Sequence, residues 1–188
     1  YIPSVEAGAN FLKIDKPEEL KFVDPACGSG HMLTYAFDLL YLIYEEIGYA
    51  PADIPGVILA NNLFGIEIDA RAGALAAFAL TMKARARQRT FFAKKVEPQI
   101  CVLESIHFTS LELDELLTSS GDRENEVAFW NQFSEAKLVG SLIVPRRELI
   151  ERLGLHLDTI SSHPKDLVTN DIIQRANRVL AQAVSLSR

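Results

Sequence analysis

Short apolar runs and longer helical patterns alternate along the first 120 residues. Three runs have the length and near-continuous hydrophobicity of buried parallel strands: residues 21–24, 63–68 and 100–103. Apolar positions three and four residues apart predict a helix over 31–47, and Asp69 is placed to cap an Ala-rich helix over 72–82 that continues into a basic stretch. The order strand, helix, strand, helix, strand predicts an α/β fold with a mainly parallel sheet.

The patterns between and after these elements are weaker. Pro51 and Pro55 predict a loop before the second strand, and the 31–47 helix, apolar almost all round, is expected to be buried between two layers. Thr109 and Glu112 form a capping box. Beyond it we expect a polar loop over 121–126. Helical segments are expected after this loop, over 129–133, 146–153 and 171–184.

Composition narrows the class of protein. The chain has 188 residues, 48% hydrophobic and 23% charged, which is typical of a globular unit, and its net charge of −6 argues against binding polyanions through bulk charge. Two cysteines, Cys27 and Cys101, exclude a disulfide scaffold and favour the reducing cytoplasm. No apolar stretch is long enough to span a bilayer. The chain opens on Tyr1 without an initiator Met, so we expect a piece of a larger protein.

The segment between the first strand and the first helix carries the most specific chemistry. It reads Asp24-Pro25-Ala26-Cys27-Gly28-Ser29-Gly30. The glycines permit positive φ and close approach of a ligand, and the helix start offers unpaired N–H groups to an anion. A ligand with both a carboxylate and an ammonium group suits this arrangement. A phosphate-binding loop is excluded because no Lys follows the glycines, and Leu33 stands where a dinucleotide fingerprint requires glycine.

A second acidic motif follows the second strand and reads Gly65-Ile66-Glu67-Ile68-Asp69. Ligands of parallel α/β sheets collect outside the carboxyl ends of the strands. The Glu67 carboxylate is therefore positioned for a ribose diol, and Ile68 offers an apolar face to a base.

Together the two motifs resemble motifs I and II of the N6-adenine DNA methyltransferases that use S-adenosylmethionine, most closely the PglX-like group of restriction and phage-exclusion systems. The resemblance implies a partial Rossmann-like methyltransferase fold, the first half of a doubly wound, mainly parallel sheet with helical extensions. It divides the chain into a lead-in (1–20), a cofactor-binding half (21–118) and a mostly helical extension (119–188).

Cofactor contacts are carried over from the resemblance position by position. It assigns Asp24 and the following turn to the methionine part, Glu67 to the ribose hydroxyls and Ile68 to the adenine ring. Glu104 matches the position near the adenine amino group, where the family has the shorter Asp. The full set of predicted cofactor residues is Asp24, Pro25, Ala26, Cys27, Gly28, Ser29, Gly30, Glu67, Ile68 and Glu104.

The catalytic Asn/Asp-Pro-Pro-Tyr/Phe motif of the family is missing from the chain. We therefore predict no catalytic residue here and no methyl transfer by the chain alone. Double-stranded DNA is expected to bind to the full-length parent protein. The unpaired edge of the first strand makes self-association of the chain possible. Two alternatives stay open: a methyltransferase acting on RNA or protein, and a non-catalytic nucleotide-binding module.

Other reactive side chains have simpler interpretations. Cys27 is predicted to fill space, not to act as a nucleophile, and valine at Gly28 or Gly30 to abolish cofactor binding more than folding. The aromatic residues Phe129, Trp130 and Phe133 are expected in the core. The four histidines lack metal-ligand spacing, and the basic residues are expected on a solvated face and not on DNA phosphates: Lys83, Arg85, Arg87, Arg89, Lys94 and Lys95.

Overall fold

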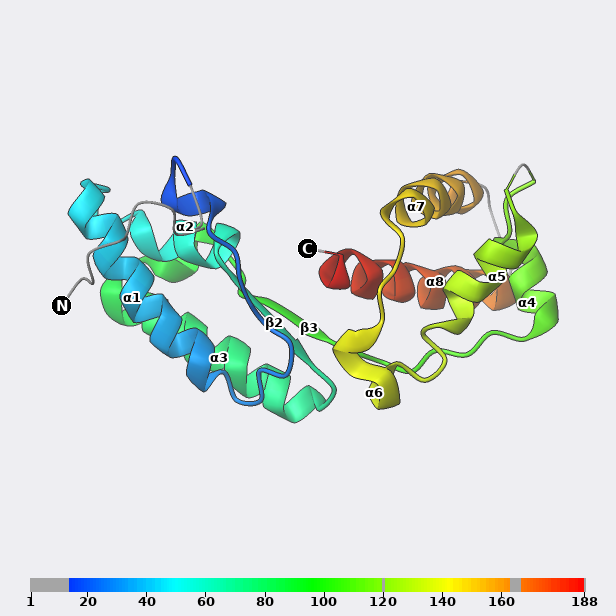
Figure 1. Cartoon of the computed structure of the whole chain (residues 1–188), viewed down its shortest axis with the longest axis horizontal. Coiled ribbons are helices and arrows are strands. Elements are labelled where there is room, and N and C mark those ends of the chain that lie inside the picture. Colours follow the sequence, from blue (N-terminus) through cyan, green and yellow to red (C-terminus); the bar gives the residue numbers. More distant parts are fainter. Residues whose placement is uncertain (1–13, 120, 163–166, 188) are drawn as a thin grey trace, which may run out of the picture.

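The chain forms two lobes that lie next to each other along the long axis of the molecule, an α/β lobe and a helical lobe (Figure 1). The structure is a computed structural model that describes residues 14–119, 121–162 and 167–187. Residues 1–13 of the predicted lead-in (1–20) lie outside the described residues. The rest of the lead-in contains a single 3₁₀ turn, Pro17–Glu19.

Within the described residues the sheet consists of three parallel strands in the order β1-β2-β3, with bounds Phe22–Asp24, Leu63–Glu67 and Gln99–Val102. Asp24 is paired with Gly65, and Glu67 with Val102, so the carboxyl ends of all three strands lie at one end of the lobe. The predicted α/β fold with a parallel sheet is confirmed, with strand limits shifted by one residue.

Helices α1 (His31–Ile47), α2 (Ile54–Asn61) and α3 (Ala70–Arg87) gather on one side of the strands in Figure 1. Both β-α-β crossovers run in the same direction across the sheet, so their right-handedness places their helices on the same face. The core of this lobe lies between the helices and that face, and it includes Leu33, Phe37, Tyr44, Leu63 and Leu80.

Two expectations for this lobe are wrong. Residues 54–61 form α2 where a loop was expected, because Pro55 lies in the first helical turn, where its missing N–H costs nothing. The first helix is also not buried between two layers. Its outward side chains are solvent-exposed in the part of the chain that the structure describes, with Tyr35 63% and Leu42 57% exposed.

The helical lobe contains five helices among the described residues, with their bounds as follows: α4 (Ser110–Leu116), α5 (Arg123–Asn131), α6 (Ala136–Val139), α7 (Arg147–Ser161) and α8 (Leu167–Leu186). The predicted capping box of Thr109 and Glu112 is present at α4. The polar loop expected over 121–126 ends at Asp122, whose carboxylate accepts hydrogen bonds from the first N–H groups of α5.

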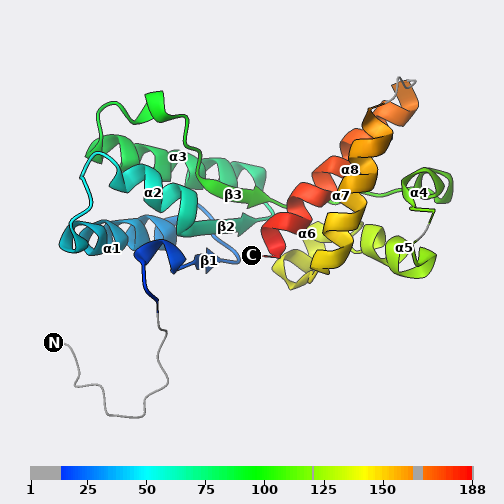
Figure 2. The same ribbon diagram turned by 90° about the horizontal axis from the view of Figure 1, so that it is seen from above.

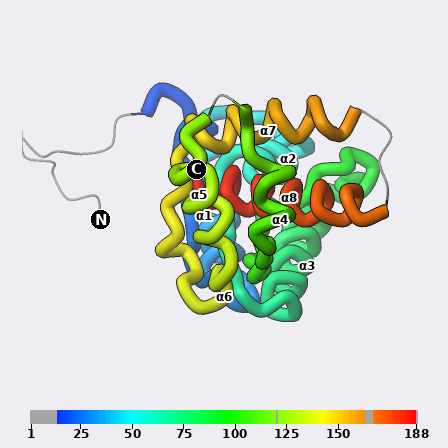
Figure 3. The backbone as a smooth tube through the Cα atoms, turned by 90° about the vertical axis from the view of Figure 1, so that its right-hand side faces the viewer, coloured from blue at the N-terminus to red at the C-terminus, as the bar shows by residue number. Residues whose placement is uncertain are grey.

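The core of the helical lobe continues onto the sheet. Phe129, Trp130 and Phe133 are fully buried in it, which confirms their interpretation as core residues. Ile66 of β2 and Leu103 just after β3 belong to the same cluster, so the helices partly cover the face of the sheet opposite α1. Figure 3 looks from this lobe toward the sheet and shows the helices in front of it.

A buried carboxylate fastens the first two helices of this lobe together. Glu126 of α5 has no exposed surface and accepts hydrogen bonds from the backbone N–H (2.8 Å) and hydroxyl (2.6 Å) of Thr118, just beyond α4. Arg152 of α7 lies 3.0 Å from the same carboxylate. The site is closely packed, because a Cβ added at Gly121 would fall 1.8 Å from Glu126 Oε1.

The edge of the sheet formed by β1 is open. β1 is paired with β2 on one side, and among the described residues no strand pairs with its second side (Figure 2). Val23 in the middle of β1 is 41% exposed. Of the described helices, none combines the length and hydropathy that a bilayer crossing requires.

Candidate functional site

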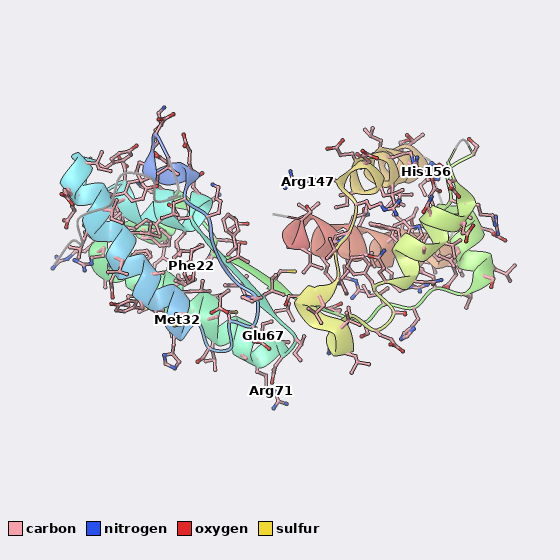
Figure 4. The ribbon with its side chains drawn as sticks, in the orientation of Figure 1. Phe22, Met32, Glu67, Arg71, Arg147 and His156 are labelled. Carbon is pink, nitrogen blue, oxygen red and sulfur yellow. The ribbon has the colours of Figure 1, made fainter. Side chains whose placement is uncertain are left out.

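The turn between β1 and α1 presents backbone groups at the carboxyl end of the sheet. Gly28 and Gly30 have left-handed backbones, with φ of +53° and +83°. Gly30 is the N-cap of α1 and supplies no side-chain acceptor, so the first-turn N–H groups of this 17-residue helix are available to an anion. Figure 4 shows Met32, Glu67 and Arg71 at this same end of the α/β lobe.

The two glycines of the turn have different surroundings. A Cβ at Gly28 would meet nothing within 4 Å, so this backbone can be approached from outside. A Cβ at Gly30 would lie 2.9 Å from the Cβ of Ala76, so Gly30 is needed for packing between the turn and α3. The prediction that valine affects binding more than folding stays a prediction for Gly28, whereas at Gly30 the contact with Ala76 leads us to expect a loss of folding as well.

Glu67 ties the two motifs together. Its Oε2 accepts a hydrogen bond from the N–H of Gly28 (2.7 Å), and its Oε1 accepts from the N–H groups of Ile68 (2.8 Å) and Asp69 (3.0 Å). These N–H donors, that of Asp69 first, lower the pKa of the Glu67 carboxyl, so the group is ionised at neutral pH. Asp69 caps α3 as predicted, accepting from the N–H of Arg71 at 2.8 Å.

Cys27 lies beneath the turn. It is 6% exposed, and its Sγ packs against the backbone of β2 at Gly65. Burial first, and then the nearby charges of Asp24 and Glu67, raises the pKa of the Cys27 thiol to about 11. The sulfur is therefore a neutral thiol that fills space, and the geometry gives no support to a nucleophile.

The remaining predicted cofactor residues lie around this turn. Asp24, half-buried at the end of β1, accepts a hydrogen bond from the N–H of Ala26 at 3.2 Å, and Pro25 and Ala26 are exposed. Ser29 is partly buried. Ile68 is 45% exposed at the end of β2 and presents apolar surface there.

Glu104 comes directly after the third strand end. Leu103 donates its N–H to the carbonyl of Glu67 (2.8 Å), which places Glu104 one residue beyond the last contact between β2 and β3. Its carboxylate accepts a hydrogen bond from Arg178 of α8 (3.1 Å), and its N–H donates to Gln182 Oε1 (3.0 Å). Sequence analysis missed both partners, because they lie more than 70 positions further along the chain.

Most of the basic residues at the end of α3 and just beyond it have partners. Lys83 forms an ion pair with Asp38, and Lys94 lies 2.7 Å from Asp53. The guanidinium groups of Arg85 and Arg87 lie over aromatic rings, Arg87 4.4 Å from the centroid of Tyr41. These contacts support the interpretation as a solvated face.

Metal ligands do not gather in the described part of the chain, where no group of three or more His, Cys, Asp or Glu side chains is placed to hold an ion. One of the four histidines, His163, lies outside the described residues.

A glycine turn at the start of a helix, joined to a carboxylate at the end of the next parallel strand, defines the class of the protein: a Rossmann-like domain with a ligand site at the strand ends. A family model described as "MmeI, DNA-methyltransferase domain" matches residues 10–106, just over half of the chain. The chain belongs to this family.

Curated relatives point the same way. The chain is 46% identical over 103 residues to the "Adenine-specific methyltransferase BrxX" of Escherichia coli O9:H4 (strain HS), which covers 55% of this chain and 8% of the relative. It is 40% identical over 136 residues to the "Adenine-specific methyltransferase PglX" of Lacticaseibacillus casei (strain Zhang), covering 70% of this chain and 11% of the relative. The predicted PglX-like resemblance is confirmed, and the chain spans about a tenth of each relative.

Proposed function

We propose that this chain is the S-adenosylmethionine-binding part of a DNA methyltransferase that transfers a methyl group to N6 of adenine, in restriction-modification or phage defence. The names of both relatives and of the matching family support the reaction. The observation that carries the cofactor assignment is the hydrogen bond from Gly28 to Glu67, which joins the open turn to the strand end beside it.

The residues at the strand ends fit the parts of this cofactor. The helix start and Asp24 suit its carboxylate and ammonium groups. A carboxylate offers about four lone-pair directions, and Glu67 uses three of them for N–H groups, so one remains for a ribose hydroxyl. Ile68 would pack on the adenine ring, and Glu104 would accept a hydrogen bond from its amino group.

The contribution of these residues is binding and orientation. When bound, the cofactor supplies an electrophilic methyl group; the chain fixes where that methyl group points, which is the positioning part of catalysis. Contact with double-stranded DNA and the acceptors for a flipped adenine are assigned to other parts of the natural polypeptide. Cys27 and Cys101 are not joined in a disulfide, which supports a cytoplasmic location.

Calorimetry with S-adenosylhomocysteine tests the cofactor assignment in the natural polypeptide that carries this sequence. Glu67→Ala should weaken binding by about 1–3 kcal/mol, the range for hydrogen bonds to charged groups. The matched control is Asp69→Ala, the neighbouring carboxylate that caps α3, which should lower stability and leave affinity within twofold. Unchanged affinity in a folded Glu67→Ala variant would contradict the assignment.

A further inference from the structure

Helix α8 returns from the helical lobe and lies against the end of β3 (Figures 1 and 2). Two of its side chains, Arg178 and Gln182, are four residues apart and therefore on the same face of the helix. Both contact Glu104. The residue that ends the third strand is thus held from the other lobe.

Gln182 fixes the backbone at this point. The side chain is 5% exposed, and a buried amide is costly unless it is hydrogen-bonded. Its Oε1 accepts the N–H of Glu104 at 3.0 Å. The direction in which the chain leaves β3, and with it the position of the Glu104 Cα, is therefore set by α8.

Arg178 fixes the side chain. Its Nη1 donates to Glu104 Oε2 at 3.1 Å. Both side chains are about half exposed, so the pair adds little to stability, and its effect is to restrict the rotamers of Glu104. The contact uses Oε2 and leaves Oε1 for a donor from a ligand. A hollow of about 260 Å³ between β3 and α8 is lined by both side chains, so the carboxylate can be reached from outside.

A third contact keeps α8 in register with this segment. Arg175, one turn before Arg178, donates to the carbonyl of His107 (2.9 Å) and forms an ion pair with Glu112 of α4. The segment after β3 and the matching stretch of α8 are therefore fastened at several points, which makes α8 a rigid support for Glu104.

We infer that Arg178 and Gln182 are positioning residues of the cofactor site, which hold Glu104 so that its second carboxylate oxygen accepts a hydrogen bond from the adenine amino group. The inference rests on the proposed function. It makes the helical lobe part of the machinery that distinguishes an adenine cofactor from one without the amino group.

Paired ligands test this inference in the natural polypeptide. S-adenosylhomocysteine carries the amino group, and its inosine counterpart has a carbonyl oxygen in that place. Arg178→Met should weaken binding of S-adenosylhomocysteine about tenfold and leave binding of the inosine counterpart within twofold. Arg178→Lys, which keeps a donor of the same charge, should restore most of the loss, and Gln182→Met should reduce the preference in the same direction.

The matched control is Arg152→Met on α7, whose guanidinium lies 3.0 Å from Glu126 and does not contact Glu104; it should lower stability without changing the preference between the two ligands. Equal weakening of both ligands by Arg178→Met would show a structural role only and overturn the inference, as would unchanged binding of both. If the unmodified polypeptide bound neither ligand, the proposed function itself would fail. That result is distinct from an effect of the variant.

Discussion

Gly28 and Gly30 are two residues of the same type in the same turn, but their surroundings in the fold differ. Both were predicted from the sequence as places where backbone approaches a ligand, and both have positive φ. The contact of Gly30 with Ala76 cannot be predicted from the local sequence. Ala76 lies 46 positions further along the chain, and the contact depends on how α3 packs against the turn. The role of Glu67 in bracing Gly28 is likewise a contact between two motifs that are separate in the sequence.

Valine at Gly28 should abolish cofactor binding while lowering stability by about 1–2 kcal/mol, the cost of a left-handed backbone. Gly48→Val is the matched control: Gly48 also has positive φ and open surroundings, at the far end of α1. It should show the same loss of stability by urea denaturation and no loss of cofactor affinity by calorimetry. Gly30→Val should unfold most readily of the three. Normal binding by Gly28→Val would contradict the cofactor role of the turn.

The hydrogen bonds to Glu67 should make stability depend on pH. These hydrogen bonds lower the pKa of the Glu67 carboxyl in the folded state, so the unfolded chain binds a proton at Glu67 more readily than the folded chain does. The stabilisation from the hydrogen bonds is therefore fully present above the ordinary pKa of 4.5. It is lost as the pH falls through the lowered pKa of the folded state. Urea denaturation of Glu67→Gln and the unmodified chain should therefore differ by about 1 kcal/mol near neutral pH, a low figure since the side chain is partly exposed. The difference should shrink in acid. A difference that stayed constant with pH would contradict this account.

At the scale of elements, strongly patterned segments were predictable and locally ambiguous ones were not. The strands and α1 follow from apolar runs, and α4 from its capping box. Helix α2 was missed because Pro51 and Pro55 indicate a loop, although proline is compatible with a first helical turn. α7 extends to Ser161, beyond the expected end at 153, because Leu153 and Leu157 find a shared core with α8 that no local pattern reveals.

The connection between α4 and α5 should depend on the buried carboxylate. Glu126→Ala removes the acceptor for two Thr118 donors, and leaving the partly buried N–H unpaired should cost about 1–3 kcal/mol. Glu124→Ala, an exposed position on the same helix, should cost less than about 0.5 kcal/mol. Urea denaturation of both variants gives the comparison. Equal effects would show that the Glu126 contacts do not stabilise the lobe.

On the scale of the whole molecule, the open edge of β1 should govern association. Unpaired N–H and C=O groups along an edge strand invite pairing with another chain, and charged residues on the strand oppose it. We therefore expect concentration-dependent dimerisation of the 188-residue chain in sedimentation experiments, reduced by Val23→Lys. Val168→Lys, an exposed valine on α8, serves as the control and should leave association unchanged. A monomer at all concentrations would contradict this expectation.

The hydrogen bond between Glu104 and Gln182 has a consequence for how such chains can vary. These residues are 78 positions apart, so their contact closes a long excursion of the chain through the helical lobe, part of which also packs on the sheet through Ile66 and Leu103. For a polymer closed at its ends, doubling the length of the loop adds only about 0.6 kcal/mol of closure entropy. Changes in the length of the outer loops of this excursion should therefore cost little stability, provided that the contact joining its two ends keeps its geometry.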